Sequence, residues 1–484
     1  MVDKKSFGSD HYVHMLYIKK FKHEGYKFGD LVTSYYNQKN AVYPLFYHWV
    51  IAHFFFETSQ KSPNKINTFL FLLSYAFFNL FCFTQFESLA ILDYLKLNIV
   101  FSVFPFSYAF WNAKNRGLSP RAFGLLLGQL FTYLLIFHIE SPSVFTFLSL
   151  LLISFVTLIS SQFSNQFLIL LSVALSIITG SFVYLLLPLL SIGFLYLFFP
   201  TLTKSFIRGQ YYHKYNYAKY LAPVYILQLR PSIYRDFIYD FWARLKNFKQ
   251  DKIKTLYYIY TNPLLELIYG FPFLWICLAL LINNDTAELN TPMWSIILSS
   301  LGVFFLTSFR PTRFLGEPQR YVEFVIPLIT IAFVQMTNTY IFASSVMVSF
   351  LFIFLTQSVF YYFRKEGENK FYPIKNFLLN NLHKKDIIVS NDSNLIKYLL
   401  PNYRVIKTDL TRYYKDRNDF LVYNPKSFSI ISVQGLLKFI QDYQANILLL
   451  NKSLYSDEEF KFLKENVSLI KIDAKEDYEI YKLG

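Results

Sequence analysis

Two short stretches near the N-terminus carry side chains that could do chemistry. In GSDHYVHM (8–15), Asp10 and His14 are four residues apart. On a helix they would lie on one face, where they could share a proton or hold a metal ion. A carboxylate fixed beside a hydroxyl could act as a general base or a metal ligand. The competing interpretation is structural, because an aspartate after Ser9 is also typical of a helix N-terminus, with His14 merely interfacial.

The second stretch, NAVYPLFYHWVIA (40–52), predicts a short apolar helix with Pro44 near its first turn, a position that proline tolerates. The helix is too short to span a membrane before the polar sequence ETSQKSPNK. Tyr43 and His48 are candidate acceptor-binding or interfacial residues. Because aromatic bodies with polar tips are stable at a membrane surface, we expect His48 to anchor the chain there.

The third stretch, FLGEPQRYVEF (314–324), ends an arginine-containing loop between two apolar segments. A guanidinium offers a planar fork of donors that matches a phosphate, so the loop is a candidate site for a lipid-linked phosphate or diphosphate. Its candidate side chains are Arg310, Arg313, Arg320 and Tyr321. Positive charges beside membrane spans also orient those spans, and the same two interpretations apply to Arg116 and Arg121 in KNRGLSPRAFG.

The composition of the chain is that of a membrane protein. Its 484 residues are 54% hydrophobic and 16% charged, whereas an ordinary soluble domain is about 25% charged. The net charge is +15, and the positively charged residues lie beside apolar segments and in a terminal domain. This placement favours contact with anionic lipid or a phosphorylated substrate over contact with nucleic acid. Cys82 and Cys277 lie inside apolar runs and predict neither a disulfide framework nor a zinc site.

Hydropathy predicts a polytopic α-helical membrane protein with about ten spans. They are expected near 66–85, 97–112, 123–139, 143–160, 165–180, 182–199, 263–283, 293–309, 324–341 and 343–362. Only Thr179-Gly180 separates the fifth span from the sixth, so this pair could also be one long helix. Two polar and aromatic segments, 1–65 and 200–262, are expected to lie at the membrane interface, the second within the membrane domain 66–362.

After Tyr362 the composition predicts a small soluble α/β domain, residues 363–484. We expect strands at 386–390, 404–408, 446–451, 468–472 and 478–483, and helices near 393–400, 433–443 and 456–465. This sequence contains neither a glycine-rich phosphate loop nor a dinucleotide-binding fingerprint. The domain is therefore expected to pack on or recognise something, and not to catalyse.

The early acidic motif with its histidine, the Tyr-Pro helix, the many spans, the late arginine loop and the C-terminal α/β domain together resemble the GT-C superfamily. These integral-membrane glycosyltransferases take a sugar from a polyprenyl-phosphate carrier. The resemblance implies that Asp10 is the catalytic or metal-binding aspartate, with a divalent metal as one option for a cofactor. It matches Tyr43-Pro44 to the family's Tyr-Pro-Pro segment, and it implies a span before the acidic loop, which we expect this chain to lack. The side chains it implies for the carrier phosphate are Arg320, Tyr321, Arg313 and Arg310.

The resemblance thus implies a bacterial-type membrane glycosyltransferase of cell-envelope polysaccharide biosynthesis. It would move a sugar from a polyprenyl-phosphate donor to a hydroxyl on a glycan, lipid or protein, with Asp10 as base and His14 assisting. The resemblance implies a multi-pass protein of the inner membrane with an extracytoplasmic active site. Lys and Arg concentrate in the segments placed outside, which favours the opposite orientation; either orientation keeps the three stretches on one side.

Two other functions fit parts of this pattern. A polysaccharide polymerase or ligase could join lipid-linked glycans through the arginines without a catalytic carboxylate. A transporter or flippase of lipid-linked glycans would need a polar pathway, but the predicted spans contain little intramembrane charge. Glu266 and His138 are the main exceptions, both near span ends.

Overall fold

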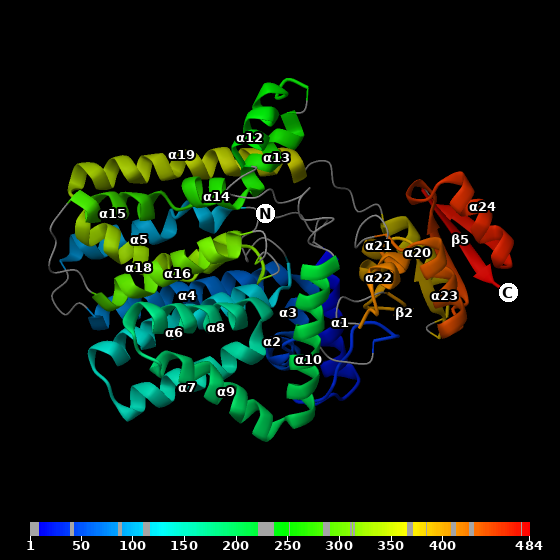
Figure 1. Cartoon of the computed structure of the whole chain (residues 1–484), viewed down its shortest axis with the longest axis horizontal. Helices are drawn as coiled ribbons and strands as arrows, with labels where there is room; N and C mark the ends of the chain where they lie inside the picture. Colours follow the sequence, from blue (N-terminus) through cyan, green and yellow to red (C-terminus); the bar gives the residue numbers. More distant parts are fainter. Residues whose placement is uncertain are drawn as a thin grey trace.

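The computed structural model describes residues 9–38, 43–85, 90–109, 117–220, 237–250, 252–283, 291–309, 312, 315–364, 371–383, 385–407, 413–424, 430–475 and 477–484. Within these residues, helices form a layered bundle, and a five-stranded sheet belongs to a separate C-terminal domain (Figure 1).

Every expected span has a helical counterpart, but the helices differ in length. Five helices in the described part of the chain are long and apolar enough to cross a membrane: α4 (Pro63–Gln85), α6 (Pro120–Glu140), α8 (Gln162–Thr179), α16 (Thr291–Ser308) and α19 (Thr339–Arg364). Shorter apolar helices occupy three other expected spans: α7 (Val144–Ser160), α9 (Val183–Phe198) and α18 (Ile326–Met336).

Two expected spans are broken by proline. The helices α14 (Pro263–Gly270) and α15 (Pro272–Asn283) meet at an angle of 76° and together could make one further span. Likewise α5 (Ile91–Ser102) stops before the short 3₁₀ helix η1 (Pro105–Tyr108). Proline lacks a backbone N–H and cannot continue the preceding helix, so hydropathy alone overestimates the length of these segments.

The pair at 165–199 consists of two separate helices. The first, α8, ends at Thr179, and Gly180 follows in the left-handed conformation with φ of 67°. This is the usual conformation after the last helical turn, and glycine adopts it without steric cost. The short sequence break therefore ends one helix and starts the next.

Aromatic side chains form much of the bundle core. The ring of Phe78 stacks on Phe101 with centroids 4.5 Å apart, and Phe167 stacks on Phe324 at 3.9 Å. The second pair fixes the segment before α18 against α8. In contrast, α19 presents large apolar side chains such as Phe350 outward, as a lipid-facing helix does.

The two segments that the sequence predicts at the membrane interface have helices at one end of the bundle. The N-terminal part forms α1 (Ser9–His23), α2 (Phe46–Phe54) and α3 (Phe56–Lys61), and α10 (Pro200–Asn216) runs across the ends of the bundle helices (Figure 1). The other described parts of the second interfacial segment are α12 (Phe237–Lys246) and α13 (Lys252–Thr261). In Figure 1, α1 lies between the bundle and the C-terminal domain.

The C-terminal sheet has the strand order β2-β1-β3-β5-β4. Its strands match the five expected ones: β1 (Ile387–Ser390), β2 (Arg404–Val405), β3 (Ile447–Asn451), β4 (Leu469–Lys475) and β5 (Tyr478–Leu483). Strand β1 pairs in parallel with β2 and β3, and β5 pairs antiparallel with β3 and β4.

Five helices accompany this sheet. Three match expected helices: α21 (Ser393–Leu399), α23 (Val433–Tyr443) and α24 (Asp457–Asn466). Two others were not predicted: α20 (Tyr372–Asn381) and α22 (Arg417–Tyr423). Each is short, with 10 residues in α20 and 7 in α22. In α20, Ile374 and Leu378 are buried four residues apart, a pattern too brief to stand out beside the polar linker.

Candidate functional site

Asp10 lies in the first turn of α1, the helix that the sequence predicted to carry both Asp10 and His14. In this turn the positive end of the helix dipole favours a carboxylate, and the basic residues of α1 lie in its last turn. The Asp10 side chain is 61% exposed, and its Oδ1 accepts a hydrogen bond from Lys397 Nζ at 2.9 Å. Desolvation acts to raise the pKa of Asp10, but its charged and hydrogen-bonding neighbours, Lys397 first among them, together outweigh desolvation and hold that pKa below its usual range. The carboxylate is therefore ionised.

His14 lies on the same helix and is buried. Its Nδ1 is 3.0 Å from Nε2 of His48 in α2, and both rings are enclosed by protein. Burial lowers the pKa of His14 to about 3 and that of His48 well below its usual value. Two neutral imidazoles can share one proton in a hydrogen bond, so this pair can relay a proton but does not hold a charge at neutral pH.

The His48 side chain is buried inside the protein, whereas a surface anchor would have an exposed polar tip. The short helix α2 packs directly on α1, and its His48 side chain is fully buried between them. A second difference concerns Pro44, which precedes the helix because α2 begins only at Phe46. The apolar composition of α2 could not distinguish burial under α1 from exposure to lipid headgroups.

A third histidine, His11, was not singled out from the sequence. Its Nδ1 accepts a hydrogen bond from the Leu118 N–H at 3.1 Å, and burial lowers its pKa to about 4. This contact ties the start of α1 to the segment that leads into α6. Helical spacing of three or four residues pairs Asp10 with His14 and not with His11, because His11 follows Asp10 directly and lies on another face of the helix.

Tyr43 completes the aromatic wall of this site. Its ring meets His14 edge-on at 5.3 Å between centroids and His48 at 5.7 Å. Burial raises the pKa of Tyr43 to about 12, with the charges of Arg121 and Arg320 acting in the opposite direction. The Tyr43 hydroxyl therefore keeps its proton and can donate it in a hydrogen bond.

Arg121 and Arg320 bring positive charge to the same site. Arg121 is in the first turn of α6, and its charge acts on Asp10, His14 and Tyr43. Arg320, more than 300 residues from Asp10 in sequence, also acts on Tyr43. Tyr43 is thus within electrostatic reach of Asp10 on one side and of Arg320 on the other, so it links the three stretches.

The arginine loop itself is held by buried contacts. Arg320 lies in the short helix α17 (Gln319–Glu323), where it forms an ion pair with Glu317, and its guanidinium is 5.5 Å from the centroid of the Phe163 ring. The Tyr321 hydroxyl donates to the Leu315 carbonyl at 2.6 Å. Three other predicted arginines, Arg116, Arg310 and Arg313, lie outside the described residues.

Glu266 belongs to the same polar cluster. It is fully buried in α14 and accepts a hydrogen bond from Gln319 Nε2 at 2.7 Å. Glu317, Arg320 and Glu323 lie close enough to act on it electrostatically. An ionisable side chain inside a membrane segment is a signal of function by default, and Glu266 is one of the few that the sequence offered.

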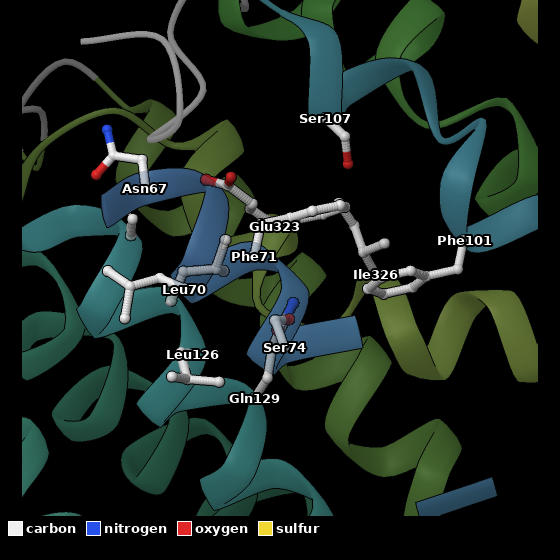
Figure 2. A pocket seen from close by; sticks show the side chains of 12 residues that line it. Asn67, Leu70, Phe71, Ser74, Phe101, Ser107, Leu126, Gln129, Glu323 and Ile326 are labelled. Carbon is white, nitrogen blue, oxygen red and sulfur yellow. The ribbon is translucent and has the colours of Figure 1, made fainter. Parts of the chain in front are cut away.

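A small, partly open cavity lies beside this cluster (Figure 2). Its polar lining comes from α4, α6, η1 and α17, and the Glu323 carboxylate points toward Asn67 in Figure 2. Ser74 donates a hydrogen bond to Gln129 Oε1 across the cavity wall. The cavity therefore combines a few polar groups with apolar walls. The lining residues are Asn67, Leu70, Phe71, Ser74, Phe101, Ser107, Ala122, Leu125, Leu126, Gln129, Glu323 and Ile326.

Among the described residues, no group of three or more histidines, cysteines or carboxylates has the arrangement of a metal site. Asp10 has one carboxylate and a lysine partner, so it offers only part of a ligand set for a divalent ion. A metal at Asp10 remains a prediction from the resemblance.

The helical bundle with its C-terminal sheet has a fold similar to that of two solved structures of one membrane protein. A solved structure that it matches is ArnT from Cupriavidus metallidurans bound to undecaprenyl phosphate, with a TM-score of 0.57 over 99% of this chain and 95% of that one. The same protein in the apo state matches with a TM-score of 0.53 over 99% and 93%. Identity is 11% in both cases, so the similarity concerns the fold. No family model and no curated protein matches the sequence.

Proposed function

We propose that this protein is a membrane glycosyltransferase that moves a sugar from a polyprenyl-phosphate carrier to an acceptor hydroxyl. The observation that carries the proposal is that Tyr43 lies within electrostatic reach of both Asp10 and Arg320, which come from distant stretches of the sequence. The fold supports it, because ArnT shares this fold over nearly its whole length and has been solved with undecaprenyl phosphate bound.

In the proposed reaction, Asp10 is the base. Its ionised carboxylate accepts the proton of the acceptor hydroxyl as that oxygen attacks the anomeric carbon of the sugar. The bond between this carbon and the carrier phosphate breaks, and a glycosidic bond forms. His14, one turn further along α1, is proposed to assist Asp10. Its buried ring is neutral, so it adds no charge beside the carboxylate.

Arg320 is proposed to hold the carrier phosphate. Negative charge grows on the phosphate as it leaves, and a guanidinium stabilises that charge in a site shielded from water. Arg320 now pairs with Glu317, so phosphate binding would exchange one anion for another. Tyr321 would act indirectly, since its hydroxyl fixes the loop through Leu315. Arg310 and Arg313 remain predicted carrier contacts.

The acceptor is proposed to be a glycan, lipid or protein of the bacterial cell envelope. The helices α1 and α2, which carry Asp10 and His48, lie at the same end of the bundle as α10 (Figure 1), and a lipid-linked donor would reach the site from the membrane interface there. We place this end on the extracytoplasmic side of the inner membrane, following the superfamily resemblance.

The test uses purified protein in lipid nanodiscs with a panel of undecaprenyl-phosphate-linked sugars and an envelope extract as acceptor. We expect the wild type to release undecaprenyl phosphate from at least one donor. Asp10→Asn should lower this rate by about 10²-fold or more, the usual contribution of a general base, while its thermal midpoint stays near that of the wild type.

Other outcomes point to the rival functions. Full release by Asp10→Asn, combined with loss in Arg320→Ala, would indicate a polymerase or ligase without a catalytic carboxylate. Uptake of a lipid-linked sugar into vesicles without any product would indicate a transporter.

A further inference from the structure

The span made of α14 and α15 is broken, and side chains stabilise both sides of the break. Asn262 caps the start of α14, where its Oδ1 accepts a hydrogen bond from the Leu264 N–H at 3.0 Å. Pro272 begins α15 and cannot continue the preceding helix, because proline lacks a backbone N–H. The Trp275 indole of α15 donates to the Leu267 carbonyl of α14 at 3.1 Å. Backbone groups beside the break therefore have partners inside the protein, as a break at membrane depth requires.

The short helix α14 carries a buried carboxyl group to the arginine loop. Glu266 lies in its first turn and is fully buried, and α14 contacts α17. The Gln319 Nε2 group, itself buried, donates to Glu266 Oε2 at 2.7 Å. Gln319 directly precedes Arg320 in the sequence. One hydrogen bond thus joins the broken span to the residue next to the proposed phosphate-binding arginine.

The helix α17 needs such contacts, because it has only five residues. Isolated helices shorter than about 12 residues are marginal in water, so contacts with other elements set the direction of the Arg320 side chain. The Tyr321 hydroxyl ties the loop to itself through the Leu315 carbonyl, whereas Gln319 ties it to α14. The hydrogen bond to Glu266 therefore fixes the loop relative to the bundle.

A carboxyl group is a costly way to fill space at this position. An apolar side chain would pack between α14 and α17 without the loss of hydration that a buried carboxyl group suffers. Ionisable groups inside a membrane domain are rare for this reason and indicate a function. The acceptor oxygen that Glu266 offers to Gln319 is the property that an apolar residue would lack.

We infer that Glu266 is a positioning residue for the carrier phosphate: through Gln319 it fixes α17 so that the Arg320 guanidinium is preorganised to bind that phosphate. The inference rests on the proposed function and gives a role to a buried carboxyl group that the proposed reaction does not use. A guanidinium already held in place binds an anion without the cost of ordering its loop. Glu266 acts through the loop, while the carrier is bound by other groups.

The experiment measures binding of two lipids, undecaprenyl phosphate and undecaprenol, to the purified full-length protein. Undecaprenol lacks the phosphate. Glu266→Leu removes the acceptor oxygen and should weaken binding of undecaprenyl phosphate by about 10-fold, while undecaprenol binds as before. Glu266→Gln keeps an acceptor oxygen and should bind undecaprenyl phosphate within about twofold of the wild type. Glu140→Leu, at the end of α6 far from the loop, is the control and should bind both lipids like the wild type.

A double-mutant cycle tests the route through Gln319. Gln319→Leu alone should weaken binding of undecaprenyl phosphate about as much as Glu266→Leu does. The double variant should bind no more weakly than either single variant, because all three lack the same contact. Additive losses would show that Glu266 and Gln319 act separately and would overturn the inference. If Glu266→Leu fails to fold, Gln319→Leu still reports on the loss of this contact.

Two further results would overturn the inference. One is wild-type binding of undecaprenyl phosphate by Glu266→Leu; the other is an equal loss for both lipids, which would indicate a general change of the bundle. Thermal midpoints of all variants identify a folding defect. Arg320→Gln separates the two levels of the account. If Arg320→Gln binds undecaprenyl phosphate like the wild type, the proposed carrier site fails; if it binds weakly while Glu266→Leu binds normally, only the role of Glu266 fails.

Discussion

At the residue scale, the buried histidines around Asp10 make stability depend on pH. His14 and His11 have pKa values of about 3 and about 4 in the folded protein, against 6.5 for a free histidine. A group with a lowered folded pKa is protonated first in the unfolded state, so stability is lost as pH falls below 6.5. At pH 5 the cost is roughly 2 kcal/mol for each histidine. Asp10 does not contribute in this window, because it is ionised in both states above its unfolded pKa.

We therefore predict that the thermal midpoint falls as the pH is lowered from 7 to 5, and that His14→Gln reduces this slope. Glutamine can still hydrogen-bond to His48 but cannot take up a proton. His23, exposed at the other end of α1, provides the control variant His23→Gln. Thermal unfolding in detergent at several pH values measures the slopes. Equal slopes for the wild type and His14→Gln would contradict the assignment of His14 as a buried neutral group.

The sequence was informative about residues that share one element. Asp10 and His14 could be paired in advance because helical spacing puts them on one face. The partners of this pair could not be predicted, since Lys397 is 387 residues away and His48 comes from another helix. Such contacts depend on tertiary packing, which a single sequence does not encode in any local pattern.

At the scale of elements, close packing of α6 fixes the arginine loop. A Cβ atom added to Gly128 of α6 would fall on the ring of Phe324, four residues after Arg320. We predict that Gly128→Ala destabilises the protein by about 1–3 kcal/mol, as overpacking does. It should also reduce transfer, because Phe324 must shift and α17 moves with it.

The matched control is Gly302→Ala in α16, where nothing lies within 4 Å of the added Cβ. Alanine favours a helix over glycine by up to about 1 kcal/mol, so this variant should be as stable as the wild type or more so. Thermal midpoints and transfer rates of both variants test the pair. If Gly128→Ala matches Gly302→Ala in both measurements, α6 does not set the position of the loop.

Helices and strands were predicted correctly where local composition alone determines them. The five strands of the C-terminal sheet follow from short β-branched and apolar runs, and the break at Thr179-Gly180 was visible in the sequence. The sequence did not predict the bend at Phe271 or the short length of α18. Hydropathy is averaged over a window of residues, so it does not show where a helix ends. The cavity lined by Ser74 and Gln129 also needed the packed bundle, since each residue alone looks like an isolated polar side chain.

At the scale of the whole molecule, the contact between Asp10 and Lys397 requires both chain ends to lie on one side of the membrane. We predict that cysteines at exposed positions Lys22 and Lys461 react with a membrane-impermeant maleimide from the same side. A cysteine at Ser141, between α6 and α7 at the far end of the bundle, should react only from the opposite side. The native residues Cys82 and Cys277 are buried and give a low background.

Labelling of intact cells and of inverted vesicles measures this directly. Reaction of Lys22→Cys and Lys461→Cys from opposite sides would contradict the packing of the C-terminal domain on α1. Reaction of both from the cytoplasmic side would keep that packing but would contradict the extracytoplasmic placement of the site.

The central claim is that Arg320 holds a carrier phosphate beside Asp10, and undecaprenyl phosphate binding to the purified protein tests it most directly. We predict that Arg320→Gln weakens binding by about 10-fold or more, as loss of a charge-assisted hydrogen bond does. Arg320→Lys should bind with intermediate strength. Asp10→Asn should bind like the wild type and yet fail to transfer, and Arg208→Gln, an exposed arginine of α10, controls for general attraction to anionic lipid. Wild-type binding by Arg320→Gln, with its thermal midpoint preserved, would contradict the account.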